Sequence, residues 1–542
     1  MDRTGNGALF QLQPFKKETT VNYEGTSFTS ASLVNLNANI NAWYILGLTH
    51  NSRVKAVYNI LPASDTLKLG LDPVQPELLI TDAGNQVHRC DIESGIDRAY
   101  AKRTQPRLSY LPVCDNRLFI VIEQEGNQAF VEKGAEVVRW LAGDSGEDIV
   151  NGVKDGFFQD KYLVQEETEE SQEPQNVPEN KGPLPRASIQ ARYKNTSIPA
   201  RLLGLKTAKP ERSLLVGHWY PLRNYPDILA SMIEPGMLDR GILDSHPDRV
   251  NPLDGVENGA VVYLMSLNLD KYTLGWGQGT DLPGVGWSER AVNIRKDNPF
   301  GPDGFNTMKP LIPLGHTPPF LWSKVIGTFS GGFQKRHSAF RYGELSKTEK
   351  GHHYGFMENG VLFVTPSEGL ATLIIYKDGS IDFKTWTDQD KDNLPFMKHI
   401  RQNGLPLIER NENGDGVPGK YVKHWSAGNW SGSAKKELRT PRGAACIVEM
   451  KQEKHFIYAY FSGATPSAMA RVFQAYGCNY AFQLDMNSPG QAYASLSRAQ
   501  DNSTSFEIEH LMTGMFTGDT KGTPRYLIKP DYKDFFYILR RE

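Results

Sequence analysis

The chain of 542 residues has few cysteines, no long apolar run and almost no net charge. Its four cysteines form no CxxC pair, which excludes the common zinc and dithiol motifs. A helix that spans a bilayer needs roughly 20 apolar residues, and the longest runs here, such as residues 259–265, are typical of buried strands. A net charge of −2 supplies no field that would attract nucleic acid. We therefore predict neither a membrane span nor a nucleic-acid partner.

The beginning of the sequence also lacks the basic and apolar segments of a signal peptide. We therefore expect a chain that is either cytosolic or written from a point after a removed signal. Cys90 and Cys114 could form one disulfide in an oxidising compartment, whereas Cys446 and Cys478 lie in apolar runs that predict buried thiols. These residues alone leave the compartment open.

The sequence does contain enough apolar material for a large core, with 39% hydrophobic and 11% aromatic residues. A chain of this length usually divides into two or three domains. Glutamates and prolines replace any apolar periodicity in residues 166–190, which predicts an acidic linker. We predict an α+β protein, with a β-rich N-terminal domain in 1–165, a connecting segment of helix and strand in 191–257 and a mixed α/β domain in 258–542. The N-terminal domain has no assigned role and could bind a protein partner.

Short apolar runs predict the elements of the first half. Residues 77–81 and 117–122 are typical of strands, and residues 135–141 of a short helix. After the linker, residues 213–219 predict a strand. Residues 225–243 contain an internal Pro-Gly break and predict broken helical material.

Hairpin signals organise the second half. Asp378-Gly379 can adopt the positive φ angles of a tight turn, and apolar runs at 371–376 and 381–386 flank it. A second hairpin is predicted from residues 443–450 and 455–461.

One helix and the strand after it are marked clearly. Thr465 is typical of a helix cap, Pro466 of the first helical position and Gly477 of a helix end. Between them, apolar residues recur at helical spacing and define one buried face. A strand at 478–484 is predicted to follow. Asp485 comes directly after this strand and is therefore predicted to lie at the edge of the sheet.

Three short features could carry chemistry. A carboxylate at a strand end, such as Asp485, is held firmly enough for catalysis, although an aspartate beside Ser-Pro-Gly more often caps its own turn. The paired glycines Gly331 and Gly332 allow backbone amides to approach a ligand, or simply form a tight turn. Arg442 precedes a buried strand, where a guanidinium binds either phosphate or a structural carboxylate.

Taken in order, these features resemble the phosphodiester glycosidase family, which includes the lysosomal uncovering enzyme and many bacterial exopolysaccharide-associated proteins. The family's Asn-Gly/Ala-Gly-Phe-Phe motif corresponds to Ser330-Gly331-Gly332-Phe333-Gln334, and its Arg-Thr/Ser-Ala-Ile-Gly-like strand to residues 441–445. Its Leu-Asp-Gly-Gly-Gly-Ser motif corresponds to residues 484–488. The resemblance covers the chain from about residue 258 to the C-terminus.

The resemblance implies a phosphodiester-glycosidase-like C-terminal domain that hydrolyses a sugar-1-phosphodiester in a polysaccharide or glycoconjugate. It also implies an exported or cell-surface location. In this interpretation Arg442 binds the phosphate, and Asp485 acts at the sugar as nucleophile, base or orienting acceptor. The residues implied in substrate binding are Ser330, Gly331, Gly332 and Asn487.

The departures from the family pattern support a second interpretation. Ser330 replaces an asparagine, and Met486-Asn487 replace two glycines beside which the family leaves room for substrate. The alternative is a non-catalytic surface or assembly protein that uses a degenerate form of the fold as a carbohydrate-binding or structural module. A Met-blocked pocket at Asp485 favours the alternative, whereas an open pocket joining Asp485, Arg442 and the glycine amides favours the enzyme.

A calcium loop is the only cofactor site that the sequence suggests. Asn411, Asn413 and Asp415 match its first ligand positions, but Val422 stands where the loop requires glutamate. A polar turn has the same composition. No other cofactor is predicted.

Overall fold

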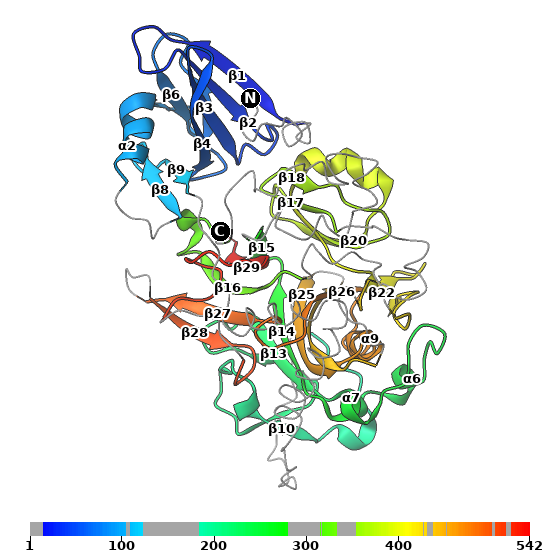
Figure 1. Cartoon of the computed structure of the whole chain (residues 1–542). Helices are drawn as coiled ribbons and strands as arrows, with labels where there is room; N and C mark the ends of the chain where they lie inside the picture. The colour runs from blue at the N-terminus through cyan, green and yellow to red at the C-terminus, as the bar shows by residue number, and fades with distance from the viewer. Residues whose placement is uncertain are drawn as a thin grey trace, which may run out of the picture.

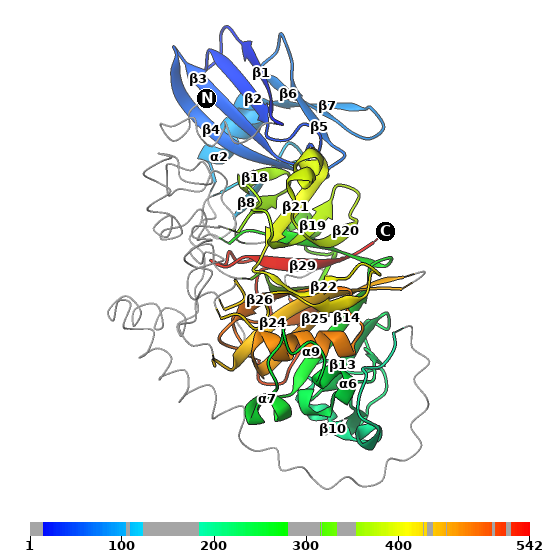
Figure 2. The same ribbon diagram turned by 90° about the vertical axis from the view of Figure 1, so that its right-hand side faces the viewer.

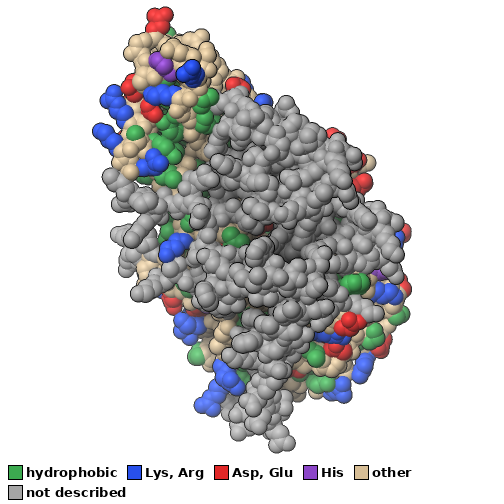
Figure 3. Space-filling view, viewed as in Figure 1, with side chains coloured by type: hydrophobic (Ala, Val, Ile, Leu, Met, Phe, Trp, Pro, Cys, Tyr) green, Lys and Arg blue, Asp and Glu red, His purple; other side chains and the backbone are tan. Residues whose placement is uncertain are grey.

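The computed structural model describes residues 15–103, 109–122, 184–279, 315, 317–332, 354–425, 428–430, 437–450, 453–500, 505–515 and 522–541. The chain is mostly β-structure, arranged in several domains with multiple antiparallel sheets (Figure 1). The predicted helix at 135–141 lies outside the described residues. Lysine, arginine and acidic side chains are interspersed on the described surface seen in Figure 3, as the small net charge leads us to expect.

Two sheets form the N-terminal domain. The larger one has the strand order β1-β2-β3-β4-β9-β8, and the smaller one β5-β6-β7. Their strands are β1 (Lys17–Asn22), β2 (Ser30–Asn35), β3 (Tyr44–His50), β4 (Arg53–Pro62), β5 (Lys68–Leu71), β6 (Glu77–Thr81), β7 (Val87–Asp91), β8 (Tyr110–Val113) and β9 (Leu118–Val121). The prediction of strands at 77–81 and 117–122 is confirmed. In β6 only Leu78 and Ile80 are buried, because alternate side chains of a strand point to opposite faces.

The largest sheet of the C-terminal half has the strand order β12-β13-β14-β25-β24-β26-β22-β23. Its strands are β12 (Tyr220–Pro221), β13 (Ile228–Ile233), β14 (Val262–Asn268), β22 (Pro406–Arg410), β23 (Gly416–Pro418), β24 (Thr440–Glu449), β25 (Lys454–Ala464) and β26 (Tyr480–Met486). The central strands β24 and β25 are buried along nearly their whole length, which explains their continuous apolar runs. They form the hairpin predicted at 443–461.

Three further sheets surround it. They have the orders β15-β29-β16-β27-β28, β18-β17-β21-β19-β20 and β10-β11. Their strands are β10 (Ser197–Pro199), β11 (Ser213–Leu215), β15 (Tyr272–Gly277), β16 (Val325–Ser330), β17 (Phe356–Glu358), β18 (Val361–Val364), β19 (Ala371–Tyr376), β20 (Ile381–Thr385), β21 (Met397–Gln402), β27 (Ala494–Ala499), β28 (Phe506–His510) and β29 (Phe535–Arg540). The β19–β20 hairpin was predicted, and Gly379 in its turn has the required positive φ of 79°.

Helices are short in the described residues. They are η1 (Glu93–Asp97), α2 (Arg98–Ala101), η4 (Ala191–Tyr193), η5 (Ala200–Leu202), η6 (Pro235–Met237), α6 (Arg240–Leu243), α7 (Gly255–Gly259), η8 (Pro319–Leu321), η10 (Asp388–Phe396) and α9 (Pro466–Ala475). No helix in this part of the chain has the length and apolarity to cross a membrane. Helix α9 begins as predicted, because the Thr465 side chain accepts a hydrogen bond from the amide of Ala468. Gly477, just beyond its end, has a φ of 70°.

The prediction of helical material at 225–243 is wrong for its central part. Residues Ile228–Ile233 form strand β13, whose six side chains are all buried. The strand pairs with β12 on one side and β14 on the other. An apolar run that is buried on both faces has no alternation to distinguish strand from helix, so the pairing with β14 decides the structure. The predicted strand at 213–219 is shorter, because β11 ends at Leu215.

The N-terminal domain packs directly against the rest of the chain, as the two views in Figures 1 and 2 show. Val34, Leu36 and Trp43 are part of the same buried apolar cluster as the C-terminal sheets. The last residues of the predicted linker join that cluster too, since Leu184 and Ile189 are buried in it. The domains are therefore held together by a shared apolar core.

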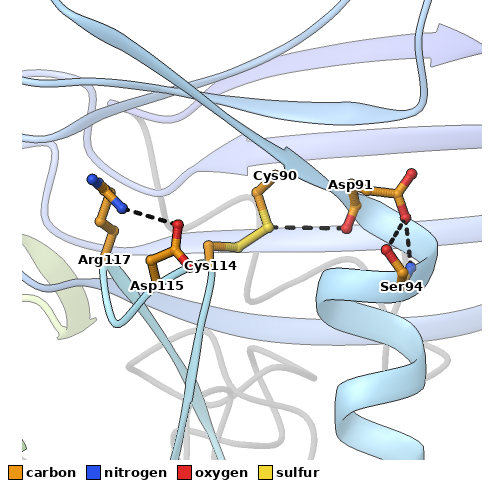
Figure 4. The surroundings of a disulfide bond; sticks show 6 residues. All are labelled: Cys90, Asp91, Ser94, Cys114, Asp115 and Arg117. Atoms are coloured by element: carbon orange, nitrogen blue, oxygen red, sulfur yellow. Dashed lines mark hydrogen bonds and ion pairs between the residues drawn. A yellow bond between two sulfur atoms is a disulfide. The ribbon is translucent and has the colours of Figure 1, made fainter.

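Two disulfides connect the four cysteines. Cys90 and Cys114 are bonded, as considered from the sequence, and tie the end of β7 to the loop after β8 (Figure 4). The prediction that Cys446 and Cys478 are buried thiols is wrong, since they form the second disulfide. Both are buried, as predicted, but the antiparallel pairing of β24 with β26 places their Cα atoms 5.9 Å apart, a separation that a disulfide spans.

Candidate functional site

Asp485 lies at an irregularity in the middle of the largest sheet. Strand β26 continues to Met486, two residues further than predicted. Arg442 of β24 pairs with Met486 and Ala444 pairs with Gln483, so two residues of β26 oppose one residue of β24. This is a β-bulge, which changes the direction of the side chains around it and is common beside active sites. The bulge places Asp485 where a regular strand would not.

The carboxylate of Asp485 forms a buried ion pair. Its Oδ2 atom lies 2.7 Å from Nζ of Lys533, and its Oδ1 atom accepts a hydrogen bond from the amide of Met486 at 2.8 Å. Both charged side chains are almost completely buried, with 9% and 3% of their surface exposed. Burial, followed by the negative charge of Asp485, raises the pKa of the Tyr458 phenol well above its ordinary value. Tyr458 therefore stays protonated and donates to the carbonyl of Ala492.

Two more buried ion pairs lie next to Lys533 in the sequence. Arg525 binds Asp531 through two nitrogen–oxygen contacts of 2.7 and 3.2 Å. Arg401, on β21, lies 3.0 Å from Asp534. Removing charges from water costs several kcal/mol for each ion, so such pairs are kept only where their partners are well placed. Their concentration in one region is typical of a functional site, although structural networks share this property.

Gly331 and Gly332 directly follow β16 and lie close to the buried ion pairs around Asp485. The amide of Gly331 donates to the carbonyl of Asp534 at 2.8 Å, and Ser330 Oγ lies 2.9 Å from the hydroxyl of Tyr526. Gly332 has a φ of 131°, and a Cβ atom there would lie 2.8 Å from the Asn403 side chain. A glycine is therefore required at this position for both conformation and space.

Arg442 is fully buried and surrounded by acceptors. Its Nε atom donates to the carbonyl of Ala464 at 2.7 Å, and Nη1 donates to the carbonyl of Asn429 at 3.1 Å and to Gln483 Oε1 at 2.9 Å. Its guanidinium lies 4.8 Å from the centre of the Trp430 ring.

Burial lowers the pKa of Arg442 to about 9. The negative charge of Glu257 raises this pKa, but by less than burial lowers it.

The two residues after Asp485 have different environments. Met486 is buried in a small apolar cluster that includes Trp430, and its sulfur lies 3.4 Å from Nη1 of Arg442. Asn487 is half-buried, has a positive φ of 88° and donates its amide to the carbonyl of Pro441. Methionine therefore packs against the guanidinium, and asparagine provides the left-handed turn that follows.

Some buried donors near Arg442 have no partner among the described residues. They are Asn429 Nδ2, Trp430 Nε1 and Gln483 Nε2. Each belongs to a residue that contacts the guanidinium, so this region presents donors and positive charge together. An acceptor-rich anion is the ligand chemistry that such a set of groups favours.

The structure therefore brings Asp485, Ser330 and Gly331 to the segment 525–534, and Gly332 lies against Asn403. Arg442 contacts the strand on either side of the bulge, at Gln483 and Met486. Five residues that belong to no sequence motif complete the network, namely Lys533, Arg525, Asp531, Asp534 and Arg401. One signal was present, because four alternating charges precede the apolar strand β29 in residues 529–534.

The suggested calcium positions form a turn between β22 and β23. The side-chain oxygen of Asn411 accepts hydrogen bonds from the amides of Asn413 and Asp415, both at 2.9 Å. These are the contacts of an Asx turn. No group of three or more His, Cys, Asp or Glu side chains that could hold a metal ion occurs in the described part of the chain. Calcium binding at Asn411, Asn413 and Asp415 stays a prediction.

Comparison with known proteins gives a distant structural similarity. No sequence family and no curated protein sequence matches the chain. The catalytic domain of zebrafish N-acetylglucosamine-1-phosphodiester alpha-N-acetylglucosaminidase, auto-inhibited by its pro-peptide, is 12% identical with a TM-score of 0.30, over 66% of this chain and 96% of that one. A hypothetical protein from Synechocystis is 9% identical with a TM-score of 0.27, over 96% and 98%. A protein assigned as exported from Burkholderia pseudomallei is 9% identical with a TM-score of 0.20, over 52% and 74%.

Proposed function

We propose that the chain hydrolyses a glycosyl phosphodiester, with Asp485 at the reacting centre. The observation that carries this proposal is the Asp485 carboxylate, directed by a β-bulge into a buried network with Lys533. The order of motifs that resembles the phosphodiester glycosidases supports it independently of the contacts. We propose in addition that residues 258–542 form a mixed α/β domain of the phosphodiester-glycosidase-like kind.

In this reaction the bond between the sugar C1 atom and the phosphodiester oxygen breaks, and water supplies hydroxyl to C1. The phosphate monoester leaves as a stable anion, so protonation of the leaving group matters less than in ordinary glycosides. Positive charge near the phosphate and a carboxylate near C1 matter more. Asp485 supplies the carboxylate as nucleophile, base or orienting acceptor.

Lys533 and Arg442 supply the positive charge in this proposal. Lys533 is in direct contact with Asp485 and holds its orientation. Arg442 meets the phosphate together with the unpaired donors of Asn429, Trp430 and Gln483. The remaining assignments follow the resemblance, with Ser330 and the Gly331-Gly332 amides at substrate oxygens and Asn487 at a sugar hydroxyl.

A specific observation favours a second function. The guanidinium of Arg442 is enclosed by protein acceptors, and buried Met486 packs against it. A non-catalytic module that binds carbohydrate, or has a structural role on a surface, needs no open path to this residue. We keep this as the alternative to hydrolysis.

An extracytoplasmic location belongs to the same proposal. Two disulfides join all four cysteines, and disulfides persist mainly in oxidising environments outside the cytoplasm. A polysaccharide or glycoconjugate substrate is found in the same places.

The test is release of free sugar from methyl phosphodiesters of sugar-1-phosphates, offered in both anomers. We expect the intact chain to release sugar from at least one substrate and Asp485→Asn to lose at least about 100-fold in rate. Asp248→Asn, which changes an exposed aspartate paired only with Arg249 among the described residues, serves as the matched control. Full activity in Asp485→Asn would contradict the assigned role. Sugar binding without hydrolysis across the panel would support the alternative.

A further inference from the structure

A cleft lies where the N-terminal domain meets the β19–β20 turn, and none of the candidate site residues lines it. Its volume is about 1330 Å³. Strands β1, β2 and β5 form one wall, and the turn at 377–380 with Phe396 forms the other. Both walls come from elements that Figure 2 shows adjacent to each other. A space of this size exceeds a typical small-molecule pocket and suits several linked units.

Positive charge dominates the lining of the cleft. Lys17 and Lys68 are exposed and have no ion-pair partner among the described residues. Lys377 also has no ion-pair partner among the described residues, and its Nζ donates to the carbonyl of Asn39 at 2.6 Å. Of the two aspartates of the lining, Asp65 pairs with Lys398 at 3.6 Å, whereas Asp378 only accepts hydrogen bonds from Ser380 and keeps its negative charge. Three lysines against this one aspartate leave the lining with a net positive charge.

The floor of the cleft is built from amide and hydroxyl groups. Asn35 donates to Asn41 Oδ1 at 2.9 Å and to the Tyr44 hydroxyl at 3.3 Å. Asn41 donates in turn to the carbonyl of Leu67 at 2.7 Å, and the Tyr44 hydroxyl accepts from the amide of Leu69. These contacts hold the polar groups in fixed positions, as a site that recognises hydroxyl groups requires.

An aromatic ring stands at the edge of this polar surface. Phe396 has 57% of its surface exposed, and it is one of the few large apolar side chains exposed in the described residues. Its carbonyl accepts a hydrogen bond from the amide of Lys377 at 3.1 Å, which holds the backbone of Phe396 beside the turn that carries Lys377. An exposed ring beside amides and hydroxyls matches the apolar face and polar edge of a sugar.

We propose that this cleft binds an acidic oligosaccharide. The lysines pair with its carboxylate or sulfate groups, the asparagine floor meets its hydroxyls, and Phe396 packs on one sugar face. The proposal does not depend on hydrolysis at Asp485, because the cleft uses none of the candidate site residues. It gives the N-terminal domain a role, which is to hold an anionic glycan at its junction with the rest of the protein.

The test is calorimetric titration of the full chain with hexagalacturonate, a sulfated heparin hexasaccharide and neutral maltohexaose at low salt. We expect binding of at least one acidic hexasaccharide and at least tenfold weaker binding of maltohexaose. Removing two lysines in Lys17→Gln/Lys68→Gln should weaken acidic binding about tenfold and reduce its salt dependence. Phe396→Ala should weaken binding while leaving the salt dependence unchanged.

Lys194→Gln/Lys209→Gln removes the same charge from exposed positions outside the cleft and should bind as the unmodified chain does. Binding is measured on the intact chain and needs no turnover, which separates this result from a failure of the proposed hydrolysis. Absence of binding to both acidic hexasaccharides would overturn the proposal. Equal losses in the two double-lysine variants, or equal binding of hexaglutamate, would overturn it as well, because the cleft would then recognise only charge.

Discussion

Asp485 and Lys533 are 48 positions apart in the sequence, yet their charged atoms are in contact inside the protein. The alternating charges of residues 529–534 mark Lys533 in the sequence, but they do not indicate that its partner is Asp485. A buried ion pair adds little net stability compared with apolar residues of the same size, but loss of one partner leaves an uncompensated charge in the core. Changes at single positions of the network therefore have large effects.

Replacing Lys533 by methionine should lower the free energy of unfolding by about 3–5 kcal/mol, because Asp485 then stays buried without its cation. The double variant Lys533→Met/Asp485→Asn should lose less than the sum of the two single variants. Urea unfolding of the four proteins measures this coupling. Lys206→Met is the control, since Lys206 pairs with Glu507 at an exposed site and should cost less than about 1 kcal/mol. Additive losses at 485 and 533 would contradict a direct pair.

His399 predicts a pH dependence of stability. It is buried, and burial lowers its pKa well below the ordinary value of 6.5, with a smaller effect from Lys398. Below pH 6.5 the unfolded chain binds a proton that the folded chain does not, so the free energy of unfolding falls as the pH falls. The loss should reach up to about 1.4 kcal/mol per pH unit.

His399→Asn removes this titration and should flatten the stability profile below pH 6.5, as thermal or urea unfolding at several pH values would show. Asparagine can still accept the hydrogen bond that His399 Nδ1 accepts from the amide of Asn359. Parallel profiles for the two proteins would mean that His399 is not the group responsible.

At the scale of elements, the β24–β26 pair carries most of the candidate site. The strands share the bulge at Asp485 and the contact of Arg442 with Gln483, and the disulfide joins Cys446 of β24 to Cys478, just before β26. Gly443 faces the bulge, and a Cβ atom there would lie 2.8 Å from the Tyr458 hydroxyl. The position of the carboxylate thus depends on the register of two strands.

Removing the Cys446–Cys478 disulfide should therefore destabilise the fold. Its cysteines are 32 positions apart, and a closed loop of that length predicts a loss of about 3–4 kcal/mol in Cys446→Ala/Cys478→Ala. Urea unfolding measures the loss, and non-reducing peptide mapping establishes the pairing. Free thiols at both positions in protein prepared without reductant would contradict the second disulfide. Cys90→Ala/Cys114→Ala, which opens the other bridge, provides the comparison.

At the scale of the whole molecule, the N-terminal domain is part of one packed structure. Trp43 lies in the main apolar cluster, and Phe119 packs against Phe320 with ring centres 5.9 Å apart. The side chain of Asn37 also donates to the carbonyl of Gly360. Separation of the two parts would expose apolar surface on both.

We therefore expect a fragment of residues 184–542 to unfold at a lower temperature than the full chain and to aggregate more readily, because it exposes the surface that Trp43 and its neighbours cover. Scanning calorimetry and light scattering measure both effects. The full chain should show one cooperative transition. An unchanged melting temperature in the fragment would mean that the shared core contributes little.

The sequence by itself determined the features that depend on neighbouring residues. The cap at Thr465, the Asp378-Gly379 turn and the β24–β25 hairpin follow from local backbone preferences and side-chain alternation, and the structure contains all three. The paired glycines and Asp485 were identified for the same reason, through short motifs in a fixed order.

The tertiary structure alone decided what depends on distant residues. The apolar run of β13 became a strand because β14 pairs with it, and Cys446 met Cys478 because two strands align. Lys533 lies just before β29, which belongs to a different sheet from β26. Its contact with Asp485 therefore depends on how the two sheets pack. Local preferences amount to about 1 kcal/mol or less for a residue, whereas pairing and burial contribute several, so long-range contacts override local signals.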